Sequence, residues 1–172
     1  MDDCLGGSYS EEIMGLEWLI PFAIVALTVV AMECVAALVH RHIMHGSGWG
    51  WHRSHHEPKN GILEKNDLYA LVFAAISFVL FALSARIWPL LWWVGLGMTV
   101  YGILYAVLHD GLVHRRFPIG RVPRNGYLKR LIQAHRLHHA VNRKDGAVSF
   151  GFLYAPPVRQ LRDELRRGNS GS

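Results

Sequence analysis

The chain has 172 residues, of which 51% are hydrophobic and only 18% are charged, a mixture too apolar for an ordinary soluble domain. Its net charge of +5 is compatible with a nucleic-acid partner, but a membrane surface that faces the cytoplasm carries the same excess beside anionic lipid. We therefore expect membrane lipid, and no nucleic acid, as a partner. Cys4 and Cys34 form no C-x-x-C pair, so no disulfide framework is expected.

Three long apolar runs, at residues 18–39, 68–85 and 87–108, predict helices that cross a membrane. The first run contains one charged residue, Glu33, and the other two contain none. About 20 apolar residues at 1.5 Å each cross a hydrocarbon core of about 30 Å, so each run is long enough. The predicted fold is all-α, an integral membrane helical bundle, in which the short link around Arg86 makes the last two spans an antiparallel hairpin.

The segments outside the bundle are short. Residues 1–16 are polar and without a clear period, so we expect a flexible N-terminal tail. Residues 17–167 are expected to form one membrane domain, and the Gly/Ser-containing residues 168–172 a disordered end. Acidic residues precede the first span where a cleaved signal carries Lys or Arg, so this helix is expected to stay in the mature protein.

The basic residues predict the orientation. All of the 18 lysines and arginines except Arg86 lie on one side of the predicted bundle. By the positive-inside rule this side is cytoplasmic, and with three spans the acidic N-terminus lies outside.

Ten of the 11 histidines follow a pattern that occurs twice, HxxxxH and then HxxHH. The first half contains His40, His45, His52, His55 and His56, and the second half contains His109, His114, His135, His138 and His139. Neutral imidazole is the commonest metal ligand, and each half follows an odd-numbered span, so all ten are expected in a cap at the cytoplasmic membrane surface. Ten nitrogens suit two metals with an open position each, which fits iron and dioxygen better than closed zinc sites that usually contain cysteine.

Helix geometry constrains the HxxxxH pairs. On an ideal α-helix His40 and His45 are about 140° apart, too far for one metal, so the pair either binds two metals or lies where the helix unwinds. Gly46, Gly48 and Gly50 supply such a break.

The HxxHH run is simpler, because His52, His55 and His56 share one face of a helix. His42 lies two residues after His40 and points the opposite way, so we interpret it as an ordinary interfacial histidine.

Two acidic residues are candidates for a role beside the metals. Glu33 precedes His40 by two helical turns on the same face, and is either a polar residue beneath the metals or a paired carboxyl that only helps packing. Asp110 follows His109 and either orients an imidazole or, with Gly111, only breaks the helix.

Tyr101 and Tyr105 lie one turn apart on the approach to the second histidine half. They either line a substrate slot or pack between helices that the glycines of this span bring close together.

Three shorter segments flank the spans. Asn66 and Asp67 are expected to cap the second span. The apolar, glycine-broken residues 147–154 are placed to cover the metal site, and residues 158–167 predict a short amphipathic helix.

A metal centre at a membrane face beneath apolar helices favours oxidation of an unactivated C–H bond in a lipid-soluble substrate. A membrane metal-binding or transport protein is the alternative of another class. A transporter places its ligands near the middle of the membrane, whereas these lie at or beyond helix ends, so transport is disfavoured. The basic run at residues 115–130 either attracts an acidic electron carrier or only reflects the positive-inside bias.

Several motifs carry a resemblance that spans about residues 17–160. They are GWHRSHHEP at residues 50–58, NDLY at 66–69, HDGLVH at 109–114, HRLHH at 135–139 and SFGFLYAPP at 149–157. In these motifs the chain resembles the fatty acid hydroxylase superfamily of membrane di-iron enzymes and, within it, the bacterial β-carotene 3-hydroxylases.

The resemblance implies two non-haem irons held by the ten histidines, dioxygen as co-substrate and reduced ferredoxin as electron donor. It implies a carotenoid substrate taken from the bacterial cytoplasmic membrane and hydroxylation at carbon 3 of both β-ionone rings, which gives β-cryptoxanthin and then zeaxanthin. Residues 17–167 are then a di-iron hydroxylase domain, with no catalytic side chain beyond the metal centre. A carotenoid ketolase, or a fatty acid or sterol hydroxylase with the same iron centre, is the alternative within this chemistry.

Overall fold

The computed structural model describes residues 4–57, 61, 63–117 and 119–169, and every regular element in this part of the chain is helical. The elements in chain order are α1 (Cys4–Leu38), a π-helix η1 (Val39–Ser47), α2 (Trp49–His56), α3 (Asp67–Ser84), α4 (Leu90–Tyr105), a second π-helix η2 (Ala106–Val113), α5 (Gly126–His138) and α6 (Val158–Asn169). The predicted all-α fold is confirmed.

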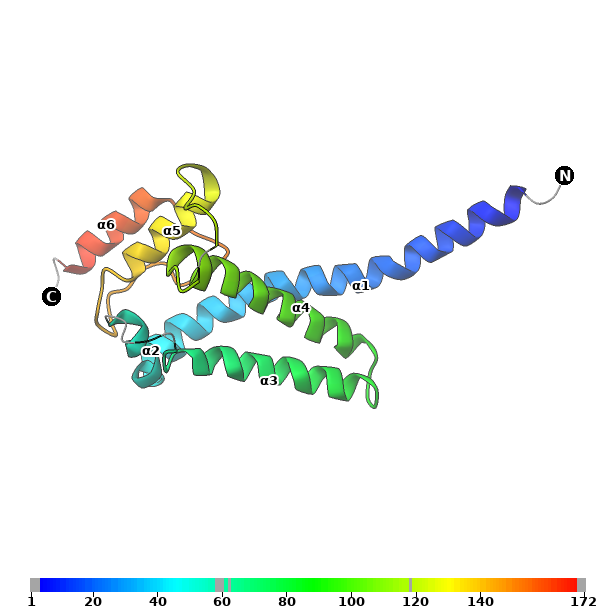
Figure 1. Ribbon diagram of the computed structural model, residues 1–172, viewed down its shortest axis with the longest axis horizontal. Helices are drawn as coiled ribbons and strands as arrows, with labels where there is room; N and C mark the ends of the chain where they lie inside the picture. Colours follow the sequence, from blue (N-terminus) through cyan, green and yellow to red (C-terminus); the bar gives the residue numbers. More distant parts are fainter. Residues whose placement is uncertain (1–3, 58–60, 62, 118, 170–172) are drawn as a thin grey trace.

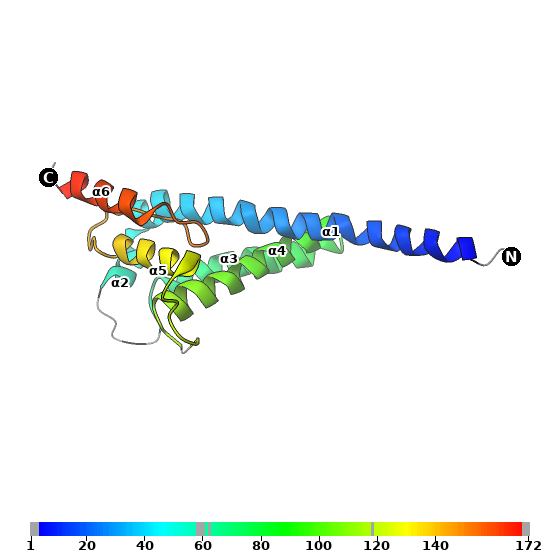
Figure 2. The ribbon, with the colours of Figure 1, turned by 90° about the horizontal axis from the view of Figure 1, so that it is seen from above.

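Three stretches are long and apolar enough to cross a membrane, which confirms the three predicted spans. They are Glu17–Ser47, Asp67–Ser84 and Leu90–Val113, with 31, 18 and 24 residues. Helices α3 and α4 form the expected antiparallel hairpin, and α1 packs along α4. The turn of the hairpin points the same way as the N-terminus, and α2, α5 and α6 gather at the opposite end (Figures 1 and 2).

The outer surface of the helices is apolar. Phe22, Leu71 and Phe78 are 69%, 63% and 72% exposed, which suits contact with lipid tails and not with water. Between the two hairpin helices, Ser77 donates a hydrogen bond to the carbonyl of Gly95 at 2.7 Å, so a hydroxyl inside the membrane has a partner.

The cap beyond the membrane has a small core of its own. It joins α5, α6 and the segment between them, and its buried residues are Leu131, Ala134, Val148, Ala155 and Leu161. Helix α6 is the amphipathic helix predicted at residues 158–167.

The predicted boundaries at residues 17 and 167 stay predictions, as does the flexibility of residues 1–16, where α1 begins at Cys4. Residues 170–172 of the predicted disordered end lie outside the described part of the chain.

Candidate metal centre

Each HxxxxH pair lies at a π-helix that ends a membrane span, with His40 and His45 inside η1, His109 inside η2 and His114 directly after η2. The N–H of His114 donates to the carbonyl of His109 at 2.9 Å, and the N–H of Gly48 to that of Ile43 at 2.8 Å, both five residues back. This bonding pattern brings residues five apart to the same side of the helix, which an α-helix does not do. Of the two alternatives that the spacing left open, the structure has the altered helix.

The chain turns away after η1 at the predicted glycine break. Gly46 has non-helical backbone angles, φ −119° and ψ −120°, and Gly48 precedes α2. Helix α2 therefore lies beside η1, and its residues His52 and His56 contact the imidazoles of η1.

The imidazoles form two groups. The ligand atoms of His40, His45, His52 and His138 lie within 4.8 Å of one another, and so do those of His55, His109, His114 and His135. His56 Nε2 lies 3.2 Å from His52 Nε2, and His139 Nε2 lies 2.9 Å from His135 Nε2. With these two added, we name the five residues His40, His45, His52, His56 and His138 the first group, and the five residues His55, His109, His114, His135 and His139 the second group.

Each group takes four histidines from one half of the sequence and one from the other. The two that cross are His55 and His138, the middle histidines of the HxxHH runs. His55 Nε2 lies 3.0 Å from His109 Nε2, and His138 Nε2 lies 3.2 Å from His45 Nε2. Neither half of the sequence can therefore complete a group alone.

Hydrogen bonds at Nδ1 orient seven of these rings, at 2.7–3.0 Å. His40, His45, His56 and His138 donate to the carbonyls of Phe150, Lys144, Val141 and Val148, and His52, His55 and His109 contact Asn66, Glu64 and Asp110. A backbone carbonyl only accepts, so Nδ1 carries the proton and Nε2 of the neutral ring has a free lone pair.

The Nε2 atoms of such rings face one another across short distances. His40 and His52 bring theirs to 3.0 Å in the first group, and His55 and His109 bring theirs to 3.0 Å in the second. Converging lone pairs repel unless a cation lies among them, so this donor set fits a metal ion in each group.

Burial keeps the rings in the neutral form that binds metal. It lowers the pKa of His52 to about 3 and the pKa of His56 to about 4. Burial first, and then the neighbouring imidazoles, lowers the pKa of His55, His135 and His138 well below the usual value of 6.5. A proton therefore competes poorly with a metal at these nitrogens near neutral pH.

The polar residues around the rings include one that was predicted and two that were not. Asp110 Oδ1 lies 2.9 Å from His109 Nδ1, the contact expected of a residue that orients an imidazole. Asn66 occupies the N-cap position of α3, as predicted, but its side chain makes no capping bond and accepts instead from His52 at 2.7 Å. Glu64 contacts His55 at 2.8 Å.

A salt-bridge network supports the second group. Arg116 binds both carboxylate oxygens of Asp67, at 2.7 and 2.8 Å, and reaches Asp110 at 3.3 Å. Because Asp110 contacts His109, the network ties this imidazole to the start of α3.

A cavity of about 470 Å³ lies between α1, α3 and α4, and most of its lining is apolar. Tyr101 and Tyr105 line it, as one alternative predicted, and Tyr101 donates a hydrogen bond to Glu33. Phe152 lines the same cavity and stacks on His40 with 5.2 Å between ring centroids. The cavity therefore extends from the membrane part of the bundle to Phe152, Asn66 and Asp110, which lie between it and the imidazoles that they contact.

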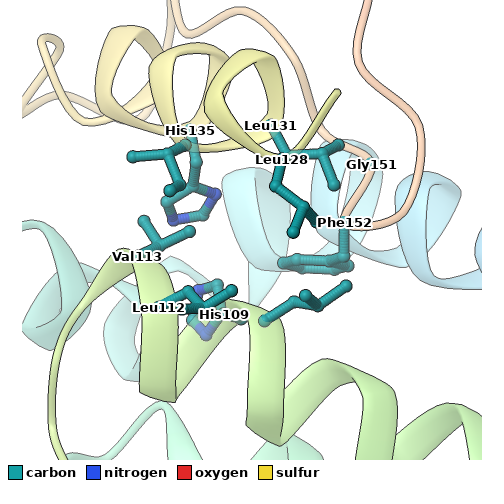
Figure 3. Close-up of a pocket in the computed structure, with 10 residues that line it drawn as sticks. His109, Leu112, Val113, Leu128, Leu131, His135, Gly151 and Phe152 are labelled. Carbon is teal, nitrogen blue, oxygen red and sulfur yellow. The ribbon is translucent and has the colours of Figure 1, made fainter. Parts of the chain in front are cut away.

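Two further pockets border the second group. One, of about 20 Å³, lies between η2 and α5, where His109 and His135 point into it beside Phe152 (Figure 3). It has room for about one water molecule and not for a ring. The other, of about 410 Å³, is open, and His114 and His139 border it together with His56 of the first group.

His42 is exposed and belongs to neither group. The structure thus brings together the ten predicted histidines and leaves out the one interpreted as interfacial. Their assignment as ligands stays a prediction.

Three membrane spans beside two groups of converging imidazoles that could hold metal define a class, the integral membrane proteins with histidine clusters at one end of the helical bundle. The fatty acid hydroxylase family model matches residues 25–156. The chain belongs to the fatty acid hydroxylase family.

Within this family, the chain is similar to individual β-carotene hydroxylases. A β-carotene hydroxylase of Paracoccus sp. (strain PC1) is 60% identical over 147 residues, 85% of this chain and 91% of that protein. A β-carotene hydroxylase of Pantoea ananas is 60% identical over 150 residues, 87% of this chain and 85% of that protein. The chloroplastic β-carotene 3-hydroxylase 1 of Arabidopsis thaliana is 40% identical over 149 residues, 84% of this chain and 47% of that protein. No solved structure matches the chain.

Proposed function

We propose that the chain is a membrane monooxygenase that hydroxylates carbon 3 of the β-ionone rings of β-carotene, which gives β-cryptoxanthin and then zeaxanthin. The observation that carries the proposal is the identity of 60% to β-carotene hydroxylases over most of both chains. The apolar cavity, whose lining residue Phe152 stacks on His40, supports a substrate from the bilayer.

We assign one non-haem iron to each group of five histidines. When bound there, iron supplies the activation of dioxygen that breaking an unactivated C–H bond requires. The protein holds the imidazoles by their Nδ1 hydrogen bonds and keeps them neutral by burial. Its apolar cavity presents the β-ionone ring of the substrate.

Hydroxylation places one oxygen atom of dioxygen in the product and reduces the other to water, which requires two electrons and two protons. We propose reduced ferredoxin as the source of the electrons. The exposed residues Arg136, Arg143 and Lys144 near the open pocket support docking of an acidic carrier there.

We further propose that the histidine cap faces the cytoplasm of a bacterial cell, because nearly all basic residues lie on its side. Reporter fusions at the two chain ends test this orientation. A reporter that works only in the cytoplasm is expected to be active when it is fused to the C-terminus. A reporter that works only outside the cytoplasm is expected to be active when it is fused to the N-terminus.

Expression in cells that accumulate β-carotene, followed by chromatography of the pigments, tests the activity. Zeaxanthin supports the proposal. Canthaxanthin instead indicates a ketolase, and unchanged pigment indicates a fatty acid or sterol hydroxylase or a metal-binding protein.

A further inference from the structure

Glu33 is a carboxylate inside the first membrane span, and the function proposed above gives it no part. It accepts three hydrogen bonds. The hydroxyl of Tyr101 donates to Oε2 at 2.8 Å, and the backbone N–H groups of Phe152 and Tyr154 donate to Oε1 at 2.9 Å each. One side chain thereby joins α1, α4 and the segment that follows the last histidine.

The segment passes very close to this carboxylate. A Cβ atom at Gly151 would lie 2.5 Å from Glu33 Oε1 and 2.9 Å from the carbonyl oxygen of Tyr154. Glycine at position 151 therefore allows the N–H groups of Phe152 and Tyr154, which follow it, to point at one oxygen. The path of the segment depends on this polar contact in addition to apolar packing.

The contact fixes the place of one aromatic ring. Phe152 lies parallel to His40, with an angle of 7° between the rings, and nearly perpendicular to His109 at 5.3 Å between centroids. It also packs against Tyr105 at 4.8 Å. Phe152 thus touches one imidazole of each group and lines the cavity at the same time.

We propose that Glu33 is a positioning residue that holds Phe152 at the inner end of the cavity and thereby selects which carbon of the substrate ring reaches the metal centre. The inference about the substrate ring rests on the proposed function. Glu33 acts only as a hydrogen-bond acceptor, and it neither transfers a proton nor binds a metal.

The test compares Glu33→Leu with Glu33→Gln. Leucine removes the acceptors and keeps the span apolar, whereas glutamine keeps an acceptor oxygen for the two N–H groups. Hydrogen exchange in the peptide 149–155 of the metal-free protein is expected to rise about tenfold in the leucine variant. The share of product hydroxylated at carbons other than carbon 3 is expected to rise about tenfold as well, while metal content stays at the wild-type level. The glutamine variant is expected to restore both quantities.

Tyr127→Phe is the matched control, because the hydroxyl of Tyr127 donates to the carbonyl of Leu153 in the same segment from α5. It is expected to leave the position of hydroxylation unchanged. Gly151→Ala is expected to change which carbon is hydroxylated, although Glu33 is intact. This variant replaces Glu33→Leu in the test if the leucine variant fails to accumulate.

The proposal is overturned if Glu33→Leu leaves exchange and the hydroxylated carbon unchanged, or if metal and activity fall together with the hydroxylated carbon unchanged. If the wild type does not hydroxylate β-carotene, the proposed function fails, and the exchange measurement still decides whether Glu33 holds the segment.

Discussion

The two histidine groups have the same composition and different surroundings. All five imidazoles of the first group are buried, from His138 at 0% to His45 and His56 at 6% exposure. In the second group His114 and His139 are partly exposed and border the open pocket, which the first group reaches only through the buried His56. The repeated motif therefore builds one fully buried site and one that is more open to water.

The difference arises from what covers each group. Phe150 lies edge-on to His40, His45 and His138 of the first group. Its own carbonyl also accepts from His40. A repeat in sequence thus fixes the ligand type, while the later, unrepeated part of the chain decides which site is sealed. We expect electrons and protons to enter through the second group.

Metal removal tests this difference most severely. Incubation with a chelator is expected to abolish hydroxylation, with half of the bound metal leaving before the rest, because the second group is open to the reagent. Metal analysis of the protein over time measures the loss. Release in one phase would show that the two sites are equally accessible.

His55 and His138 each complete a group whose other four histidines come from the other half of the sequence, so replacing either one should remove a ligand from that group. His55→Ala and His138→Ala are each expected to lower turnover by more than about 100-fold, beyond the loss usual for residues that only orient a ligand. His55→Ala should lose metal from the second group, and His138→Ala from the first group. Metal-specific spectroscopy of the two sites measures the loss.

His42→Ala is the control for the crossing histidines, because His42 is exposed and lies in neither group. It is expected to retain metal and turnover. A dead His42 variant with normal accumulation would contradict the assignment of ten ligands.

Loss of the residue that bonds to Nδ1 of one histidine should lower the metal affinity of the group containing that histidine and leave the affinity of the other group unchanged. Asn66→Ala is expected to lower metal affinity of the first group, and Glu64→Ala that of the second, by about 10- to 100-fold. Competition with a chelator of known affinity measures both. Glu57→Ala is the control, because Glu57 pairs with Arg53 on the surface. Equal effects of all three changes would contradict the claim that each Nδ1 partner affects only its own group.

The smallest effect is expected for Arg116→Lys. Lysine cannot bind Asp67 through two nitrogens, so the hold on Asp110 and His109 loosens, and metal affinity of the second group falls by about fivefold or less. The same chelator titration measures it. Arg53→Lys, at an exposed ion pair, should change nothing, and a similar loss there would mean that general charge effects are responsible.

The spans, the hairpin and the gathering of ten histidines could be predicted, because hydropathy and ligand spacing are local properties. The π-helices could be predicted only in part. The five-residue spacing of His40 and His45 excludes one shared metal on an α-helix, but it does not say how the backbone changes.

The crossing of His55 and His138 could not be predicted from sequence. Residues at i, i+3 and i+4 share one helix face, and only the place of α2 between the two groups directs the middle imidazole elsewhere. The partner of Asn66 was missed for a similar reason. Its position before a helix predicts the N-cap correctly, but only the folded chain brings its side-chain oxygen to Nδ1 of His52 instead of to a backbone N–H group.

The Nδ1 acceptors for His40, His45 and His56 lie 110, 99 and 85 residues later in the chain. During synthesis, the first span is therefore completed long before these rings acquire their final orientation. The first group reaches its final geometry only after residues 141–150 have been made, although four of its five histidines lie before residue 57.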